Sequence, residues 1–297
     1  MLKSIDFENK LDIKKFKRGK YINSGACGDV YQSKYNNRNV ISKRLNIKDY
    51  YDEQSWIEDA ILELNNYKYI SNTKYCCQLI GYCYNNSNIY LLLNDYNVIG
   101  DLYDFLNQEK YWLKYNRREL FTNEFFYQYK NDKWIYNMDR KLKVNITKEL
   151  LNAIYELHSR NIVHCDLKSN NILYKEKTNQ IILIDFNASH YLDKKQDKIK
   201  LHMGTLGYAC PALNYEGICS KKSDIYSLAV CIIEIWCGCI WNTGTSYREC
   251  PYELLSSLRK LKVKEPNLVK ELKKCINLNP KKRPYIQTLK KNILKLL

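Results

Sequence analysis

The chain has 297 residues, and its 48 Lys and Arg residues outnumber its 32 Asp and Glu residues, which gives a formal net charge of +16. With 45% hydrophobic and 27% charged residues, the composition is that of a globular protein and excludes a disordered or fibrous one. Five Pro and 10 Gly also exclude a collagen-like chain or a flexible linker.

Residues 1–20 carry charged side chains throughout the stretch where a secretory signal would need an apolar core. We interpret them as an N-terminal extension of an intracellular, cytoplasmic protein. The 12 cysteines are then expected to be reduced thiols, and their spacing from the four His residues does not favour a zinc site. The high content of Asn, Lys, Ile and Tyr is typical of an A/T-rich genome, such as that of a parasite or a large DNA virus, and indicates no function.

Residues 20–95 alternate between short strand-like runs and one helical stretch. A helix is predicted over about 52–65, where apolar residues recur at a period near 3.6. Gly25 and Gly28 lie between two strand-like runs, and glycines there allow backbone N–H groups to approach phosphate oxygens. Two glycines alone are a weak signal, because many hairpins carry them.

A lysine, Lys43, lies within an apolar strand that follows the glycine-rich stretch. Such a lysine usually extends its ammonium group to the surface. If the strand lines a cleft, the ammonium would instead pair with a polyphosphate and with a carboxylate of the helix. The candidate carboxylates on that helix are Glu53, Glu58 and Glu63.

The second part of the chain is mostly helical, with an amphipathic pattern over 134–160 and further helices from about residue 223. A β-rich first third and an α-rich remainder predict an α+β fold of two packed lobes with a cleft between them. Residues 107–139 are interpreted as an insertion, whose aromatic side chains would form an interaction patch or pack on the helical lobe. The apolar run 225–241 contains Glu234 and is too short to span a bilayer, so a buried helix is predicted.

The strongest motif is the run from His164 to Leu173, followed by an apolar strand that ends at Asp185. The run offers a carboxylate, a cation and an amide, which are Asp166, Lys168 and Asn171. These groups suit phosphoryl transfer. A carboxylate can orient the attacking hydroxyl, a lysine can balance phosphate charge, and hard oxygen atoms can hold Mg²⁺.

In their order and spacing, these residues resemble those of a eukaryotic-type protein kinase over about 21–289. The resemblance implies a bilobal fold with a small β-rich N-lobe (21–96), which carries one main helix, and a larger, mainly α-helical C-lobe (97–297). It also implies ATP and Mg²⁺ as cofactors. The residues that would bind the nucleotide are Asn23, Gly25, Gly28, Val30, Ile41, Lys43, Asp95, Tyr96 and Asn97.

The resemblance makes Asp166 the catalytic aspartate, Lys168 the loop lysine, and Asn171 and Asp185 the Mg²⁺ ligands. For the carboxylate that pairs with the strand lysine we choose Glu58, because apolar residues follow it as they do in the family. Glu63 remains open.

Lys168 and Thr205 together are typical of kinases that act on Ser or Thr, so the expected partners are protein substrates with Ser or Thr hydroxyls. No nucleic-acid-binding module is visible, because the basic residues are scattered. The sequence does not indicate the oligomeric state.

Several positions depart from the family pattern. Asn23 and Asn187 replace glycines, and asparagine tolerates a left-handed backbone better than most residues. Ile41 replaces a small residue and could crowd the adenine pocket. Ala212 replaces the glutamate that usually pairs with Arg283, so we expect either a substitute carboxylate such as Glu216 or an exposed arginine.

A further departure is Cys165, which replaces the arginine that in many relatives binds a phosphate on the activation loop. We therefore hypothesise activity that does not depend on phosphorylation of that loop. The alternative is a pseudokinase, a nucleotide- or partner-binding scaffold, which Asn23, Ile41 and Ala212 would favour. A kinase for small molecules is a third possibility.

Overall fold

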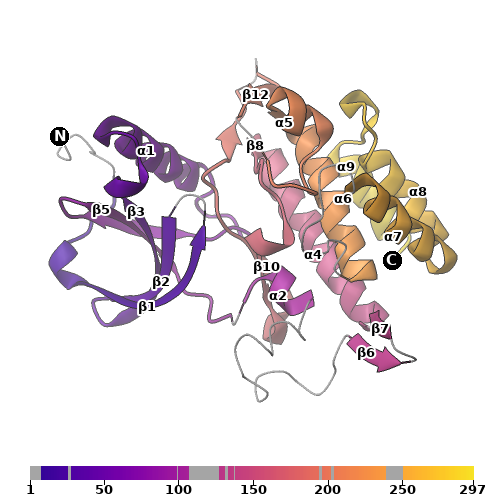
Figure 1. The fold of residues 1–297 in the computed structure, drawn as a ribbon, viewed down its shortest axis with the longest axis horizontal. Coiled ribbons are helices and arrows are strands. Elements are labelled where there is room, and N and C mark those ends of the chain that lie inside the picture. Colours follow the sequence, from indigo (N-terminus) through magenta and orange to yellow (C-terminus); the bar gives the residue numbers. More distant parts are fainter. Residues whose placement is uncertain are drawn as a thin grey trace. The chain divides into compact units, whose positions relative to one another are not determined.

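The computed structural model of the chain divides into two compact units (Figure 1). The first comprises Met1–Val98 with Asp185–Ser189, and the second comprises Ile99–Ile184 with His190–Leu297. The residues that the structure describes are 8–25, 28–98, 100–106, 127–130, 133–136, 138–193, 196–201, 204–238 and 250–297.

The first unit is built on an antiparallel sheet of five strands in the order β1-β2-β3-β5-β4 (Figure 1). Two adjacent asparagines, Asn36 and Asn37, take positive φ values of 48° and 62° in the turn between β2 and β3. This backbone matches the twist of a tight hairpin, which is why asparagine is favoured there. The strand bounds are β1 Phe16–Gly25, β2 Gly28–Tyr35, β3 Arg38–Asn46, β4 Leu79–Tyr84 and β5 Asn88–Asn94.

One helix, α1 (Glu53–Tyr69), accompanies this sheet. Its N-terminus is capped by Asp52, whose carboxylate accepts a hydrogen bond from Ser55 N at 2.7 Å. Trp56 is fully buried, and its indole nitrogen donates to Leu45 O of β3 at 3.1 Å. The helix therefore packs on the sheet through one buried face.

Residues 9–11 lie along the free edge of β4 and form what we call the N-terminal strap. Leu11 N donates to Tyr82 O at 2.8 Å, and Tyr82 N donates to Asn9 O at 3.2 Å. At Gly81 any side chain would overlap Asn9 O and Leu11, so glycine permits this close approach. The strap and the first residues of β1 both lie within the segment interpreted from the sequence as an extension.

The second unit is mainly helical. Its core helix α6 (Lys221–Cys237) is buried along most of its length and contacts α4 (Arg140–Ser159), α7 (Cys250–Lys264) and α8 (Pro266–Cys275). A capping box at Ser220 starts α6. The other helices are α2 Leu102–Leu106, α5 Pro211–Glu216 and α9 Ile286–Leu294.

Short antiparallel strand pairs complete the second unit: β9 with β10, β8 with β11, β12 with β13, and β6 with β7. The strands span β6 Tyr127–Lys130, β7 Lys133–Tyr136, β8 Ile162–Val163, β9 Ile172–Lys175, β10 Gln180–Leu183, β11 His190–Tyr191, β12 Lys198–Lys200 and β13 Ile218–Ser220. Of the predicted insertion at 107–139, residues 107–126, 131–132 and 137 lie outside the described residues.

The α+β class predicted from the sequence is confirmed, with a β-rich unit that holds one main helix and a mainly helical unit. The apolar run predicted to be a buried helix corresponds largely to α6. Within the described ranges, no helix is both long and apolar enough to cross a membrane. The assignment of 1–20, 21–96 and 97–297 to separate regions stays a prediction.

Candidate active site

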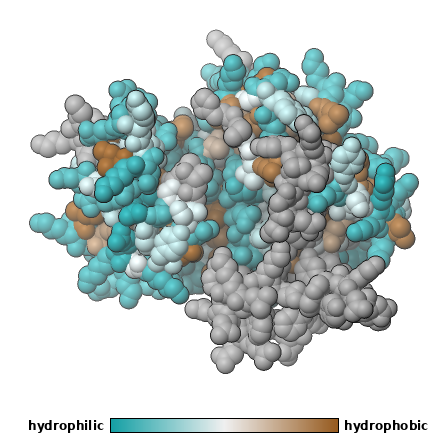
Figure 2. Space-filling model, in the orientation of Figure 1, coloured by the Kyte–Doolittle hydropathy of each residue, from teal (hydrophilic) through white to brown (hydrophobic). Residues whose placement is uncertain are grey.

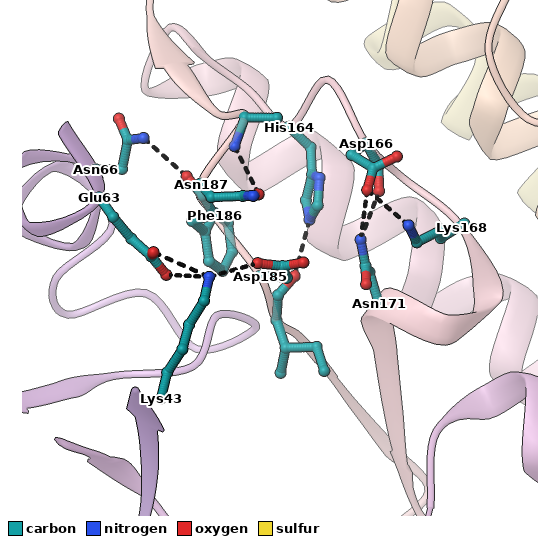
Figure 3. A network of polar contacts seen from close by, with 12 residues as sticks. Lys43, Glu63, Asn66, His164, Asp166, Lys168, Asn171, Asp185, Phe186 and Asn187 are labelled. Atoms are coloured by element: carbon teal, nitrogen blue, oxygen red, sulfur yellow. Dashed lines mark hydrogen bonds and ion pairs between the residues drawn. The ribbon is translucent and has the colours of Figure 1, made fainter. Parts of the chain in front are cut away.

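Lys43 of β3 is the centre of an ion cluster in the first unit (Figure 3). Its Nζ donates to both carboxylate oxygens of Glu63, at 2.8 and 2.9 Å, and to Asp185 Oδ1 at 3.0 Å. The side chains of Lys43 and Glu63 are only 8% and 3% exposed. The cluster is therefore an almost fully buried ion pair of Lys43 and Glu63, with the more exposed carboxylate of Asp185 at its edge.

The electrostatics of this cluster keep Lys43 charged. Burial by itself lowers the pKa of the ammonium group, but attraction to Glu63 and Asp185 outweighs burial and raises that pKa above its usual value. A cation that is held by two carboxylates is fixed in position. Such a cation is suited to bind the oxygens of a polyphosphate.

The choice of Glu58 as the partner of Lys43 was wrong, because the partner is Glu63. Glu58 is exposed and accepts a hydrogen bond from Gln54 Nε2 at 2.8 Å. On a helix, Glu63 lies on the same face as the buried Trp56 and Ala60, whereas Glu58 lies on the opposite side from Trp56. The apolar stripe of α1 therefore contained the signal that identifies the correct glutamate.

The segment that follows Asp185 is anchored on α1. Asn66 Nδ2 donates to Phe186 O at 2.7 Å, and the buried Phe186 ring meets Tyr67 with ring centroids 6.0 Å apart. Asp185 itself has a left-handed backbone, with φ of 62°. Asn187 does not, contrary to expectation; its side chain instead accepts from Ala188 N at 2.8 Å.

The glycine-rich turn lies between β1 and β2. Gly25 pairs with Gly28, which has φ of 131° and no room for a side chain beside Arg44 O. Asn23 pairs with Val30 within the extended β1, so it does not use the left-handed conformation that would explain an asparagine there. Residues 26–27 lie outside the described residues.

The remaining residues predicted to bind the nucleotide lie on β3 and after β5. Ile41 is opposite Leu93 of β5 and is half-buried. After β5, Asn97 N donates to Asp95 Oδ1 at 2.8 Å, which closes a turn in which Asn97 has φ of 52°. Tyr96 uses its hydroxyl to accept from a backbone amide.

A second cluster lies in the second unit, on the loop after β8 (Figure 3). Lys168 Nζ donates to Asp166 Oδ2 at 2.8 Å and to Thr205 Oγ1 at 2.9 Å. The Thr205 hydroxyl in turn donates to Asp166 Oδ1 at 2.6 Å. Asn171 Nδ2 donates to Asp166 O at 2.9 Å and to Asp166 Oδ2 at 3.1 Å. Every residue predicted for this loop thus converges on one carboxylate.

The buried Asp224 of α6 holds this loop from behind. Its carboxylate accepts from the backbone N–H groups of His164 and Cys165 at 2.8 and 2.9 Å, and it contacts His158 Nε2 at 2.9 Å. Burial raises the pKa of Asp224, but the hydrogen bond and charge of His158, together with the charge of His164 and the hydrogen bond from its backbone N–H, outweigh burial. The net shift of the pKa is downward. Cys165 has φ of 65°, and Asp224 stabilises this uncommon backbone.

Three buried side chains that sequence reasoning did not select join this loop to α6. Tyr208 OH donates to both carboxylate oxygens of Glu234 at 2.8 Å and lies 2.8 Å from Ser169 Oγ. Burial raises the pKa of Glu234 to about 8, and the nearby Asp101 adds to the shift. The signal in the sequence was Glu234 itself, because a lone carboxylate within an apolar helix requires a buried partner.

Arg283 differs from both expectations. It is 1% exposed, and among the described residues it forms no ion pair. The expected substitute, Glu216, is exposed. Its guanidinium donates to the carbonyl oxygens of Asn277, Lys222 and Leu278 at 2.8, 2.9 and 3.4 Å and lies over the Tyr226 ring. Peptide carbonyls and an aromatic face have replaced the carboxylate.

The two predicted Mg²⁺ ligands offer the hard oxygen atoms that this ion requires. Because the side-chain nitrogen of Asn171 donates to Asp166, its side-chain oxygen Oδ1 is the atom available to a cation. Ile184 N donates to Asn171 O at 3.0 Å and Ile184 O meets His164 Nε2 at 3.2 Å, so the strand end directly before Asp185 is fixed. No group of three or more His, Cys, Asp or Glu residues suited to a metal occurs in the described part of the chain. An amide oxygen and a carboxylate are ligands of the kind that Mg²⁺ takes, so the chemistry of Asn171 and Asp185 fits this ion.

Comparison with known proteins identifies the class. A family model for the protein kinase domain matches residues 16–293, and the chain therefore belongs to the protein kinase family, whose members use ATP and typically Mg²⁺. This agrees with the resemblance found in the sequence.

Three curated relatives illustrate the similarity. The chain is 29% identical, over 75% of its length, to a G-type lectin S-receptor-like serine/threonine-protein kinase of Arabidopsis thaliana. It is 25% identical, over 80% of its length, to mitogen-activated protein kinase kinase kinase dlk-1 of Caenorhabditis briggsae. It is 30% identical, over 49% of its length, to serine/threonine-protein kinase ppk25 of Schizosaccharomyces pombe. The matched regions make up 23%, 22% and 35% of these relatives.

Proposed function

We propose that the chain is an active serine/threonine protein kinase that transfers the γ-phosphate of ATP to protein hydroxyls. The observation that carries the proposal is the contact of Thr205 and Lys168 with Asp166 at 2.6 and 2.8 Å. A carboxylate held in this way can accept the proton of a substrate hydroxyl, and the lysine beside it can balance the charge of the transferred phosphate. The names of two of the relatives support serine and threonine as acceptors.

The cluster around Lys43 supports a matching role in nucleotide binding. Its fixed ammonium group would bind phosphate oxygens, while Asp185 and the side-chain oxygen of Asn171 would hold Mg²⁺. When bound, the ion neutralises charge on the β- and γ-phosphates. The residues of the chain then contribute mainly positioning and charge stabilisation.

We also propose that this activity does not depend on phosphorylation of the activation loop. The position of the usual phosphate-binding arginine is held by Cys165, whose buried thiol has a pKa raised by burial and by a hydrogen bond with the Cys219 thiol. Residues 204–208 are instead held by Thr205 on Asp166 and by Tyr208 on Ser169. These hydrogen bonds need no phosphate to form.

The test is a radiolabelled-ATP assay with generic Ser and Thr substrates. Asp166→Asn should lower turnover by about 100-fold or more, because it removes the proton acceptor. Lys43→Met should give a similar loss, whereas the exposed Lys48→Met serves as a matched control with unchanged turnover. Unchanged turnover in Asp166→Asn would overturn the assignment.

Phosphatase treatment tests the independence from phosphorylation. Turnover should stay within about twofold after treatment, because no cation at position 165 awaits a phosphate. A loss of more than about tenfold would reject this part of the proposal. If ATP and Mg²⁺ raise the melting temperature of the chain but no acceptor is ever phosphorylated, the scaffold alternative is correct.

A further inference from the structure

A basic hollow lies on the first unit, on strands β1, β2 and β3, and involves none of the residues assigned to the active site. Its volume is roughly 430 Å³, and it is lined by Lys17, Arg18, Lys20 and Lys34 together with polar and glycine residues. Among the described residues, no acidic side chain lines it. The unit shows mostly hydrophilic residues on the face drawn in Figure 2.

A β-bulge gathers these lysines. Lys17 pairs with Lys34 and Lys20 pairs with Gln32, so two residues of β1 lie opposite one residue of β2 between these pairs. In a regular strand, residues three apart face opposite sides, but the inserted residue brings Lys17 and Lys20 to the same face as Lys34. Gly19 permits the bulge, because any side chain there would overlap Gln32 O.

The pairing of Lys17 with Lys34 places two positive charges opposite each other and destabilises the sheet in the absence of a ligand. Like charges directly opposite each other on neighbouring antiparallel strands repel, at a separation of about 5 Å between Cβ atoms. All three lysines are exposed, and none forms an ion pair among the described residues. Arg18, in contrast, has a partner, because its guanidinium lies over the Tyr31 ring at 5.1 Å from the ring centroid.

We propose that this hollow, the bulge site, binds a compact ligand that carries two or more phosphate groups. Each ammonium group offers three N–H donors to phosphate oxygens, and bound phosphates would relieve the repulsion between Lys17 and Lys34. Lys17 and Lys34 lie about 5 Å apart across the strands. Lys17 and Lys20 lie about 7 Å apart along β1, because the bulge places them opposite residues of β2 that are only two apart. This spacing suits phosphates on neighbouring carbons of a small ring, as in a polyphosphorylated inositol, either free or as a lipid headgroup.

Binding of inositol hexakisphosphate to the full chain, measured by calorimetry at about 0.15 M salt, tests the site. Lys17→Gln/Lys34→Gln should weaken binding by about tenfold or more, since it removes the two opposed cations. The matched control is Lys270→Gln/Lys273→Gln, which removes the same charge from exposed positions of α8 and should change the affinity by less than about twofold. Equal losses in both variants would overturn the proposal and indicate attraction to the net charge only.

Two further experiments distinguish the bulge site from the nucleotide site and show whether the phosphates belong to a lipid or to a free molecule. Lys43→Met should leave the affinity for hexakisphosphate unchanged; a large loss would assign the binding to the nucleotide site and overturn the proposal. Flotation with phosphatidylcholine vesicles, with and without phosphatidylinositol 4,5-bisphosphate, shows whether the ligand is a headgroup or a free molecule. If single-stranded oligonucleotides bind but hexakisphosphate does not displace them, the surface is a nucleic-acid site and the proposal fails.

Discussion

Lys43 and Arg283 are both almost fully buried cations, but they are stabilised in different ways. Lys43 is held by the carboxylates of Glu63 and Asp185, whereas Arg283 is held by three peptide carbonyls and an aromatic ring. An ion cluster depends on the charge of each member and can be redirected toward a ligand's phosphates. A guanidinium bound to carbonyl oxygens has no titrating partner, and its role is confined to joining segments of the fold.

The first prediction addresses the carboxylate-held cation. Glu63→Gln should lower turnover by about 100-fold, because the neutral amide no longer fixes the ammonium group of Lys43 on the phosphates. Glu58→Gln provides the control on the same helix and should change turnover by less than about twofold, since Glu58 is exposed and is hydrogen-bonded to Gln54 rather than to Lys43. The radiolabelled-ATP assay measures both. Equal activities of the two variants would show that the pair has no role in catalysis.

The second prediction addresses the carbonyl-held cation. Arg283→Met should lower the free energy of unfolding by about 2 kcal/mol, because buried carbonyl oxygens lose their donors. Urea denaturation measures the loss, and Lys281→Met, at an exposed position two residues earlier, is the control. The stability difference between Arg283→Met and the parent chain should not vary between pH 6 and pH 8. A strong variation with pH would reveal a titrating partner.

The third prediction concerns the buried Glu234, whose pKa in the folded chain is raised to about 8. At pH values between the usual pKa of glutamate and about 8, Glu234 binds a proton in the folded chain but has lost it in the unfolded chain. Stability from this group therefore falls as the pH rises across that window, by at most about 1.4 kcal/mol per pH unit. Melting temperatures at pH 6, 7 and 8 should decline more steeply for the parent chain than for Glu234→Gln. Parallel declines would contradict the prediction.

The smallest expected effect concerns the turn after β5. Asp95→Ala frees the backbone N–H of Asn97, which the Asp95 carboxylate now occupies at 2.8 Å. If this amide contributes to adenine binding, the KM for ATP should fall by about two- to threefold, while kcat stays the same. Asp49→Ala, at a solvent-exposed position of the same unit, is the control. A rise in KM would show that the turn closed by Asp95 is the binding-competent form.

The sequence was sufficient to predict the fold class and the loop cluster, because short motifs with fixed spacing place Asp166, Lys168 and Asn171 on one loop. It was insufficient for the glutamate partner of Lys43, since spacing from the lysine permitted both Glu58 and Glu63. The buried face of α1 separates these two residues, and helical periodicity alone would have been the better guide.

The surroundings of Arg283 could not have been predicted in the same way. Every residue carries a backbone carbonyl, so no residue type indicates which three peptide groups will receive a guanidinium. The same applies to the positive φ of Asp185, since the next residue, Phe186, accepts a hydrogen bond from Asn66 through its backbone carbonyl. Side-chain chemistry can be inferred from sequence, whereas partners supplied by the backbone depend on the complete fold.

The N-terminal strap has a consequence for handling the protein. β4 is the last strand of its sheet, and an uncovered strand edge offers a template on which other chains can assemble. Residues 9–11 cover part of that edge with the chain's own backbone. A version shortened to begin at Tyr21 would lose this cover together with half of β1, and it should aggregate at concentrations where the full chain stays monodisperse in light scattering.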